Sequence, residues 1–522
     1  MSPPKLTIHG AGLTVTGSCF EYAFGGHRLL IDCGLFQGSR TLEALNREPL
    51  GFDPRKLDGV IVTHAHIDHS GLLPRLVAEG YRGPIWCTKA TLNLLEVMLP
   101  DAARIQEQDV ERRNRRADRA GDRAFEPTYT VEDAARVIEL ARTVKLGEAI
   151  APCPGVNARF WNAGHILGSA SVEIAAGGVR TIFSGDLGPA HKSFHPDPAA
   201  PSGFDHVVCE STYGDRDRDE VTIEQRRAIL ESEVKAALGR GGNLVIPVFA
   251  LERTQELLLD LARLINTGCL QGISVFVDSP LASKTTKVFW HHRKELEDLG
   301  SGEVFRHPSF HYVENVLESM RLNTVSGAVI LSASGMCEAG RIRHHLLHNL
   351  PRRDSTVLFV GFQAQGTLGR AIVDGAQRVR ISGRDVAVRA QIRRIDSYSA
   401  HADRGELLQW IKARAPISGS VFLTHGEAGA IEAFRRDLQK DFASVIAPEI
   451  GETYELSIGA PARRLKTGRI ELRGVINRDW QNAYADFAAN LKRELERIES
   501  PGKRAEAVTR MRAVIDELAA GR

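Results

Sequence analysis

The chain has 522 residues and a mass of 57.3 kDa, which is long enough for two or three domains with cores of their own. Its net charge of +2 excludes the global electrostatic signature of a nucleic-acid binder, so any such binding must use local patches. No apolar run approaches the ~20 residues of a membrane-spanning helix, and the N-terminus shows no secretory signal. Seven scattered cysteines without a CxxC pair indicate reduced, mostly buried thiols, and we expect a cytoplasmic protein with no membrane partner.

The first ~200 residues alternate turns with short apolar runs that are typical of strands. The runs span residues 29–34, 59–64, 84–88, 179–186 and 206–212. Helical periodicity lies between them, at 71–79, 90–98, 102–119 and 131–143. The 102–119 segment is rich in arginine, but residues 101–145 hold ten Lys/Arg against ten Asp/Glu. That balance favours a solvated helical face over an RNA-binding arm.

From about residue 212, fully apolar strands alternate with amphipathic helices, which predicts a parallel sheet covered on both faces. Near residue 395 the short-strand pattern returns in IDSYSAHAD and VFLTHGE, so we expect the second α/β domain to be inserted into the first. The predicted division is a first domain over 1–211 and 395–460, an insert over 212–394, and a basic helical C-terminal extension over 461–522.

The extension carries 14 Lys/Arg against 9 Asp/Glu and contains two amphipathic helical patterns. The patterns are Phe487, Leu491, Leu495 and Ile498, and then Val508, Met511, Ile515 and Leu518. Their apolar stripes need a partner surface, which favours docking on the chain's own domain or on a second subunit over an RNA arm. We therefore expect a homodimer through the insert or the C-terminal helices.

A cluster of histidines stands in Val62–Gly71, VTHAHIDHSG, directly after an apolar run. A strand that ends at His64 lets His64 and His66 point the same way, because alternate side chains share a face. Asp68 and His69 can then turn towards a neighbouring point. Two imidazoles for one metal and a carboxylate plus an imidazole for another suit a two-zinc site.

Further ligand-type residues follow apolar runs downstream: His165, Asp186 and His425. These residues can complete two metal shells, and Asp186 is able to bridge them with a hydroxide between the metals. Asp32, at the end of LLIDCG, is better placed as a carboxylate that orients a ligand and the metal-bound water.

In this order, Asp32, HAHIDH, His165, Asp186 and His425 resemble the ligand motifs of the metallo-β-lactamase superfamily. The resemblance implies an α/β fold, a four-layer αβ/βα sandwich, with two Zn²⁺ ions at one edge of the sheets. Mn²⁺ is an accepted substitute for such histidine and carboxylate ligands.

The large insert is similar to that of the β-CASP branch, whose members are nucleases acting on RNA or DNA. Asp186 and His425 are 239 positions apart (425 minus 186), and an α/β domain fills most of that distance. Glu210 in CESTYG and His401 in SAHAD match the branch's own motifs. The stretches VDSPLA, SASGMCEAGR and GFQAQGTLGR resemble bacterial and archaeal relatives of the messenger-RNA 3′-end cleavage endonuclease. The resemblance covers about residues 5–458.

The resemblance implies a zinc-dependent ribonuclease that cleaves single-stranded RNA with a hydroxide activated by two metals, leaving 5′-phosphate and 3′-hydroxyl ends. DNA-repair members of the branch usually lack a histidine at the position of His425, which favours RNA. The sequence does not decide between endonuclease and 5′-exonuclease. The alternatives are a DNA-acting β-CASP nuclease, a small-molecule ester or lactone metallo-hydrolase, and a non-catalytic RNA-binding subunit.

The roles implied for single residues follow from the motifs. His64, His66 and His165 would hold one zinc, Asp68, His69 and His425 the other, and Asp186 both. His401 would be the general acid on the leaving 3′ oxygen, with Glu210 bonded to its other ring nitrogen. The alternatives for His401 are a seventh metal contact and a structural histidine.

Two regions are candidates for substrate contact. Ser334 and Gly335 end a predicted strand just before a helix, where free N–H groups favour a phosphate, although a tight turn is the other interpretation. Ser399 is a weaker candidate for the same contact. Residues 376–395 hold six arginines against one aspartate, which is typical of an RNA-gripping face or of a solvated β edge protected by charge.

Overall fold

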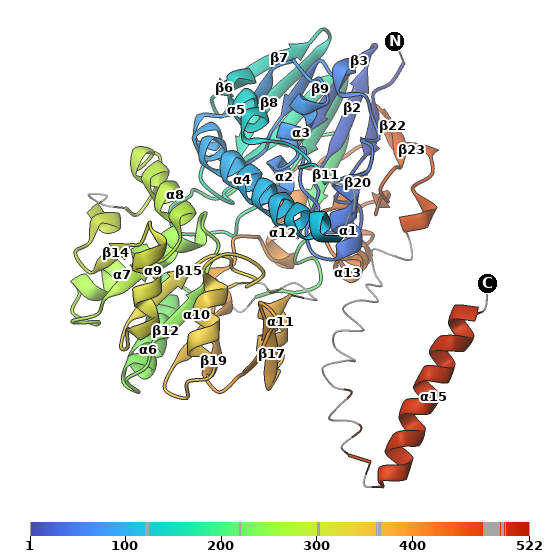
Figure 1. The fold of residues 1–522 in the computed structure, drawn as a ribbon. Helices are drawn as coiled ribbons and strands as arrows, with labels where there is room; N and C mark the ends of the chain where they lie inside the picture. The colour runs from blue at the N-terminus through green and yellow to red at the C-terminus, as the bar shows by residue number, and fades with distance from the viewer. Residues whose placement is uncertain are drawn as a thin grey trace.

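The structure is a computed structural model of the chain (Figure 1). It describes residues 2–120, 125–218, 221–299, 303–361, 363, 367–472, 491, 495, 497, 498 and 500–520. Three large sheets and one two-stranded sheet organise these residues. Two of the large sheets form the body at the top of Figure 1, and the third forms a separate unit below it.

The first large sheet has eight strands and brings the N-terminus beside the returning C-terminal part of the chain. In spatial order they are β23 (Ala460–Lys466), β22 (Thr453–Ser457), β1 (Lys5–Ile8), β2 (Phe20–Phe24), β3 (His27–Ile31), β4 (Gly59–Ile61), β5 (Ile85–Thr88) and β6 (Ala141–Val144). Leu30, Val60 and Ile85 lie in one core with apolar residues of the helices α3 (Leu73–Ala78), α4 (Lys89–Ala120) and α5 (Val131–Leu140). These helices therefore cover the sheet's outer face.

The second large sheet has seven strands. In spatial order they are β21 (Val445–Ile446), β20 (Val421–Thr424), β11 (His206–Glu210), β10 (Val179–Phe183), β9 (Ala170–Ala176), β8 (Val156–Asn162) and β7 (Ala149–Cys153). One face packs against the first sheet, so that Phe160, Val172 and Phe422 share a core with Tyr22 and Ile31. The other face packs against α12 (Arg404–Lys412) and α13 (Ala428–Leu438).

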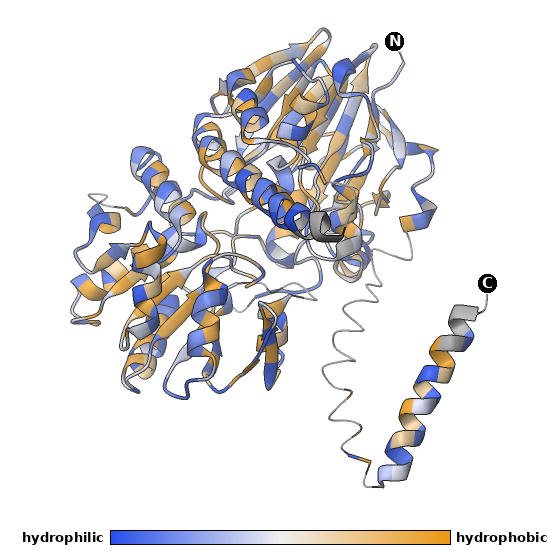
Figure 2. Cartoon of the chain, in the orientation of Figure 1, coloured by the Kyte–Doolittle hydropathy of each residue, from blue (hydrophilic) through white to orange (hydrophobic). Residues whose placement is uncertain are grey.

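The resulting order of layers is helix, sheet, sheet, helix, which confirms the predicted αβ/βα sandwich. Figure 2 is consistent with this order, because hydrophobic residues recur along the strands of the body, while the outer helices carry hydrophilic as well as hydrophobic residues. Strands whose residues alternate in burial, such as β8 with its pattern of buried and exposed positions, place one face in the core between the sheets.

The third large sheet belongs to the insert, and all its strand pairs are parallel. In spatial order its strands are β14 (Phe310–Tyr312), β13 (Val275–Val277), β15 (Val329–Ser332), β12 (Leu244–Pro247), β16 (Thr356–Phe359) and β19 (Gln391–Arg394). Leu244 and Ile246 face α6 (Ile223–Leu238), α7 (Arg253–Asn266) and α8 (Pro280–His291). Val245 faces α10 (Ile342–Asn349) and α11 (Leu368–Val373) on the other side. The prediction of a parallel sheet covered on both faces is confirmed.

The insert leaves and re-enters the body at two neighbouring strands. β11, which precedes it, pairs in parallel with β20, which follows it, and the register aligns Glu210 with Thr424. The long helix α4 of the body packs against α8 of the insert. The remaining elements are short or peripheral: α1 (Arg40–Leu45), α2 (Ile67–Ser70), α9 (Val316–Arg321), α15 (Pro501–Ala520), the hairpin β17 (Arg378–Ile381) and β18 (Arg384–Ala387), and 3₁₀ turns at Pro54–Lys56, Glu303–Arg306, Leu322–Thr324, Asp396–Tyr398 and Ile470–Leu472.

Some expected elements differ in detail. The helix expected over 131–143 ends at Leu140, because the next residues pair with β5 as strand β6. The short-strand pattern expected at IDSYSAHAD is a 3₁₀ turn at Asp396–Tyr398, in which Ile395 and Tyr398 are both buried at the spacing of one turn. The helical extension expected from 461 begins instead with β23, an edge strand rich in arginine that pairs with β22.

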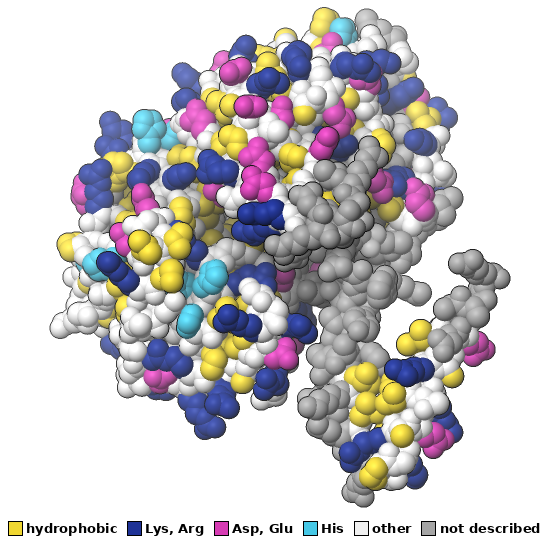
Figure 3. Space-filling model, viewed as in Figure 1, with side chains coloured by type: hydrophobic (Ala, Val, Ile, Leu, Met, Phe, Trp, Pro, Cys, Tyr) yellow, Lys and Arg dark blue, Asp and Glu magenta, His cyan; other side chains and the backbone are white. Residues whose placement is uncertain are grey.

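Several broader expectations can be compared with the described residues. The second extension helix is present as α15, whereas the first, over 487–498, lies mostly outside the described residues. All seven cysteines are unpaired and six are buried, as predicted. Among the described residues, every helix is too short or too polar to cross a bilayer. Figure 3 shows Lys and Arg side chains scattered over one face with Asp and Glu between them, in keeping with the small net charge.

Candidate metal centre

The ligand-type residues gather at one edge of the two body sheets, because each of them follows a strand. Asp32 follows β3, His64 and His66 follow β4, and Asp68 and His69 lie on the short helix α2. His165 lies between β8 and β9, Asp186 follows β10, and His425 follows β20. Asp32 and His425 have positive φ angles of 59° and 48°, a backbone region that is costly for residues other than glycine and that recurs at functional sites.

The first group joins His64, His66 and His165 with Asp186, and all its ligand atoms lie within 4.8 Å of one another. His165 Nε2 is 3.1 Å from His66 Nδ1 and 3.6 Å from Asp186 Oδ2, and His64 Nε2 is 3.5 Å from the same oxygen. The Nδ1 of His165 donates to the Ala400 carbonyl at 2.8 Å, which turns Nε2 towards the group.

The second group joins Asp68, His69 and His425 within the same distance limit. His425 Nε2 is 3.4 Å from Asp68 Oδ2, and His69 Nε2 is 3.1 Å from Asp186 Oδ1. The structure thus brings together the two sets of ligands that the sequence predicts, although the predicted roles of these residues stay predictions.

Asp186 lies between the two groups, with one oxygen towards each. Oδ2 faces His64 and His165, while Oδ1 faces His69 and lies 3.7 Å from His425 Nδ1. Both oxygens and His64 Nε2 are buried without a hydrogen-bond partner. Buried polar atoms of this kind are costly, and a bound cation would satisfy them. The donor set of imidazoles and carboxylates suits a divalent metal ion.

The protonation states of the first group suit coordination, whereas in the second group Asp186 and Asp32 outweigh burial and hold the pKa of His69 well above its ordinary value. Burial lowers the pKa of His66 to about 4 and holds the pKa values of His64 and His165 well below the ordinary value. Burial would raise the pKa of Asp186, but His425 and His69 outweigh it and hold that pKa well below its ordinary value. Neutral imidazoles and an ionised carboxylate are the forms that bind metal ions.

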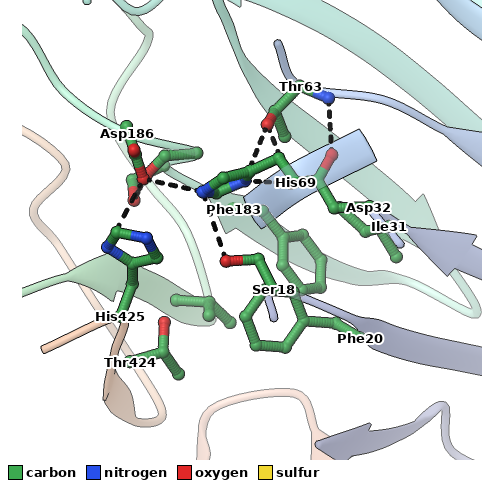
Figure 4. A pocket seen from close by; sticks show the side chains of 13 residues that line it. Ser18, Phe20, Ile31, Asp32, Thr63, His69, Phe183, Asp186, Thr424 and His425 are labelled. Carbon is green, nitrogen blue, oxygen red and sulfur yellow. Dashed lines mark hydrogen bonds and ion pairs between the residues drawn. The ribbon is translucent and has the colours of Figure 1, made fainter. Parts of the chain in front are cut away.

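Asp32 contacts a ligand rather than joining either group (Figure 4). Its carboxylate accepts hydrogen bonds from Thr63 N at 2.8 Å, Thr63 Oγ1 at 2.8 Å and His69 Nδ1 at 2.7 Å. The bond from Nδ1 leaves His69 Nε2 facing Asp186. Sequence reasoning anticipated Asp32 but missed Thr63, and also Ser18, whose Oγ lies 3.2 Å from His69 Nε2. The position of Thr63 directly before HxHxDH was the available signal for it.

His401 and Glu210 form a pair beside the first group. His401 Nδ1 lies 3.3 Å from Glu210 Oε1 and 3.8 Å from Asp186 Oδ2. Glu210 is buried and also accepts from Leu187 N at 2.6 Å, whereas the His401 side chain is 22% exposed. Asp186, Glu210 and His401 form a third set of ligand atoms within 4.8 Å, so the geometry accommodates both the proton-donor and the metal-contact interpretation of His401.

The surroundings of the predicted substrate contacts differ in part from expectation. Ser334 and Gly335 follow β15, but α10 begins only at Ile342, because the chain first folds into a turn. Ser334 N donates to Ala339 O at 3.2 Å, so it is not the free helix N-terminal donor that was expected. Ser399 Oγ donates to the Tyr213 hydroxyl at 3.2 Å. Phosphate contact by these residues stays a prediction.

A two-sheet αβ/βα sandwich with such ligand groups at its edge fits a metal-dependent hydrolase. Family comparisons agree. The model described as "Metallo-beta-lactamase superfamily" matches residues 14–223, and "Beta-Casp domain" matches residues 254–372. A third, "Zn-dependent metallo-hydrolase RNA specificity domain", matches residues 385–448.

Among known proteins, "Ribonuclease TTHA0252" of Thermus thermophilus is 36% identical over 86% of this chain and 99% of its own length. "Transcription termination factor FttA" of Methanothermobacter thermautotrophicus is 29% identical over 81% of this chain and 67% of its own length. An "RNase J-like protein" of Methanocaldococcus jannaschii is 27% identical over 81% of this chain and 92% of its own length. The chain belongs to the β-CASP branch of the metallo-β-lactamase superfamily.

Proposed function

We propose that the chain is a zinc-dependent ribonuclease that hydrolyses phosphodiester bonds of single-stranded RNA. The observation that carries this proposal is the position of Asp186, whose two oxygens each face one histidine-rich group, with the His401–Glu210 pair alongside. The names of the relatives support the choice of RNA, since one is named a ribonuclease and another is named RNase J-like.

His64, His66 and His165 would hold one zinc ion, Asp68, His69 and His425 the other, and Asp186 both. When bound, two such cations lower the pKa of a coordinated water and neutralise charge on the phosphate. The orphaned atoms of His64 and Asp186 support this assignment, as does the bond from His69 to Asp32, which fixes the ring nitrogen that faces Asp186. Manganese is the expected substitute.

His401 would supply the proton that the leaving oxygen needs when the P–O3′ bond breaks. Its Nδ1 lies against Glu210, so the carboxylate would hold the ring with Nε2 free to carry that proton. Cleavage on this side of phosphorus leaves a 3′-hydroxyl on one product and a 5′-phosphate on the other. Ser334 Oγ and Gly335 N–H are the proposed contacts for the scissile phosphate.

The test is cleavage of labelled single-stranded RNA by the purified full chain with zinc. The Asp68→Ala/His69→Ala variant removes two ligands of the second group and should lose about one equivalent of zinc together with cleavage. Chelator treatment of the parent should abolish cleavage, and added zinc or manganese should restore it. Products should ligate through a 5′-phosphate without prior kinase treatment.

The same assay separates the other functions. Single-stranded DNA cut faster than RNA would favour the DNA-acting nuclease, and ester or lactone turnover without RNA cleavage would favour the small-molecule hydrolase. RNA binding without turnover in the presence of bound zinc would contradict the enzyme proposal and favour a binding subunit.

A further inference from the structure

Glu252 starts helix α7 of the insert in an unusual backbone conformation. Its φ of 68° and ψ of −62°, with the Arg253 N–H donating to the Leu251 carbonyl at 2.9 Å, make residues 251–253 a tight three-residue turn of the strained γ type. A glutamate in this region persists only where its surroundings hold it. The side chain is 2% exposed, so those surroundings are protein contacts.

Those contacts lead to the loop that carries His165. Glu252 Oε2 accepts from the Leu167 N–H at 3.2 Å. Oε1 accepts from Lys192 Nζ at 3.1 Å and from His195 Nε2 at 2.7 Å. Lys192 Nζ in turn donates to the His165 carbonyl. One carboxylate of the insert is therefore bonded to two backbone groups of this loop: directly to the Leu167 N–H, and through the Lys192 ammonium to the His165 carbonyl.

The KSFH loop (Lys192–His195) belongs to the body but is buried against the insert. Phe194 packs in the apolar core with Phe289 and Phe305, at ring-centroid distances of 5.9 and 6.2 Å. Ser193 Oγ accepts from Arg226 at 2.9 Å. The cationic end of the Glu252 network is thus anchored in the insert as well, so any shift of the insert would move both ends of the network.

We propose that Glu252 is a positioning residue through which the insert fixes the imidazole of His165. It acts on the Leu167 N–H directly and on the His165 carbonyl through Lys192, and it touches neither the imidazole nor the substrate. The bond from His165 Nδ1 to the Ala400 carbonyl orients the imidazole ring. The bonds of Glu252 to Leu167 and Lys192 fix the position of the loop that carries this ring. The inference rests on the proposed metal site but not on RNA as the substrate.

The test is zinc binding by the full chain with Glu252→Gln, which keeps the size of the side chain but removes the charge that pairs with Lys192. Chelator competition should show two equivalents in the parent. In the variant one equivalent should bind about 10–100-fold more weakly, because partners that orient a ligand carry effects of that size. The other equivalent should be unchanged. Amide hydrogen exchange over 164–169 in the zinc-free protein should accelerate, and the visible spectrum of the cobalt-loaded protein should change.

Two further variants separate positioning from general destabilisation. Asp278→Asn is the matched control, because Asp278 is an equally buried carboxylate of the insert whose partners Ser319, Arg341 and His345 belong neither to the KSFH loop nor to the His165 loop. It should lower Tm and leave both zinc affinities intact. The double variant Glu252→Gln/Lys192→Met removes both buried charges. Its Tm should rise from that of Glu252→Gln towards that of the parent, while its zinc affinity stays weak.

The outcomes have distinct meanings. Parent affinity in Glu252→Gln, or recovery of zinc affinity together with Tm in the double variant, would overturn the positioning role. A parent that fails to bind two zinc ions would instead contradict the proposed metal site.

Discussion

The sharpest prediction concerns Asp32→Asn, because an amide cannot reproduce the three hydrogen bonds of the carboxylate. Oδ1 of Asp32 accepts from Thr63 N, and Oδ2 accepts from Thr63 Oγ1 and His69 Nδ1, all within 2.8 Å. An asparagine has one acceptor oxygen, so its NH₂ group must face one of the two sides. Each choice has a specific cost.

If the NH₂ group faces Thr63 N, two donors oppose each other in a buried site, which costs about 1–3 kcal/mol. If it faces His69, Nδ1 must become an acceptor and the ring proton moves to Nε2, the atom that lies 3.1 Å from Asp186. A protonated Nε2 cannot bind a metal ion. Both outcomes weaken zinc binding by the second group. The expected loss is about 10–100-fold in affinity for one zinc equivalent, which corresponds to the ~1–3 kcal/mol given above.

The assay is zinc titration with parallel measurement of RNA cleavage for the parent, Asp32→Asn and a matched control. Asp58→Asn is that control, because the Asp58 carboxylate also accepts from a histidine Nδ1 and a backbone N–H, those of His27 at 2.9 Å and Arg28 at 2.8 Å. It lies by the opposite end of β3 and should leave zinc binding unchanged. Normal zinc affinity and cleavage in Asp32→Asn, or an equal loss in Asp58→Asn, would refute the reasoning.

Three further predictions follow from other parts of the molecule. His401→Asn should lower kcat by about 10²–10⁴-fold, with zinc content and KM nearly unchanged if the residue is the general acid, whereas lost zinc would indicate a metal contact. A triple variant with glutamine at Arg378, Arg380 and Arg384 should bind RNA more weakly, and its slope of log K against log salt concentration should be shallower by up to about 3. An unchanged slope would identify a solvated β edge. Burial would raise the pKa of Glu252, but His195 and Lys192 lower it to about 2 from an ordinary 4.5, so its ionisation stabilises the fold by about 3 kcal/mol above pH 4.5. That contribution is lost as the pH falls towards 2. The difference in unfolding free energy between the parent and Glu252→Gln, measured in urea, should therefore shrink by about 3 kcal/mol over this range. A difference that does not change with pH would contradict the prediction.

The ligand groups could be anticipated from sequence because each ligand is tied to a local signal. An apolar run that ends in a polar residue marks the end of a buried strand, and strand ends at one edge of a sheet are neighbours in space. His64, Asp186 and His425 all follow that rule. The parallel sheet of the insert was predictable from the alternation of apolar strands with amphipathic helices, whereas the four layers of the body were implied by the resemblance to the superfamily.

Apart from Asp32, the residues that hold the ligands could not be anticipated, because their partners are distant in the chain and carry no periodic signal. Leu167 and Glu252 are 85 positions apart, and Ala400 lies 235 positions from His165. A buried glutamate at a helix start looks like an ordinary N-terminal acid in the sequence. Local boundaries failed for a related reason: the residues after Leu140 have helical periodicity, but β5 offers them a strand partner.

The site of the insertion gives the insert direct access to the chemistry. Glu210 ends the strand before the insert, His401 follows the last insert strand, and His425 ends the strand on which the chain returns. β11 and β20 are paired in parallel, so the two junctions lie side by side at the edge that carries the ligand groups. A displacement of the insert would therefore act on the His401–Glu210 pair through the backbone and on His165 through Glu252. Because both routes end at Asp186 Oδ2, which lies 3.6 Å from His165 and 3.8 Å from His401, docking of the insert should change the proposed proton donor and one proposed metal ligand together.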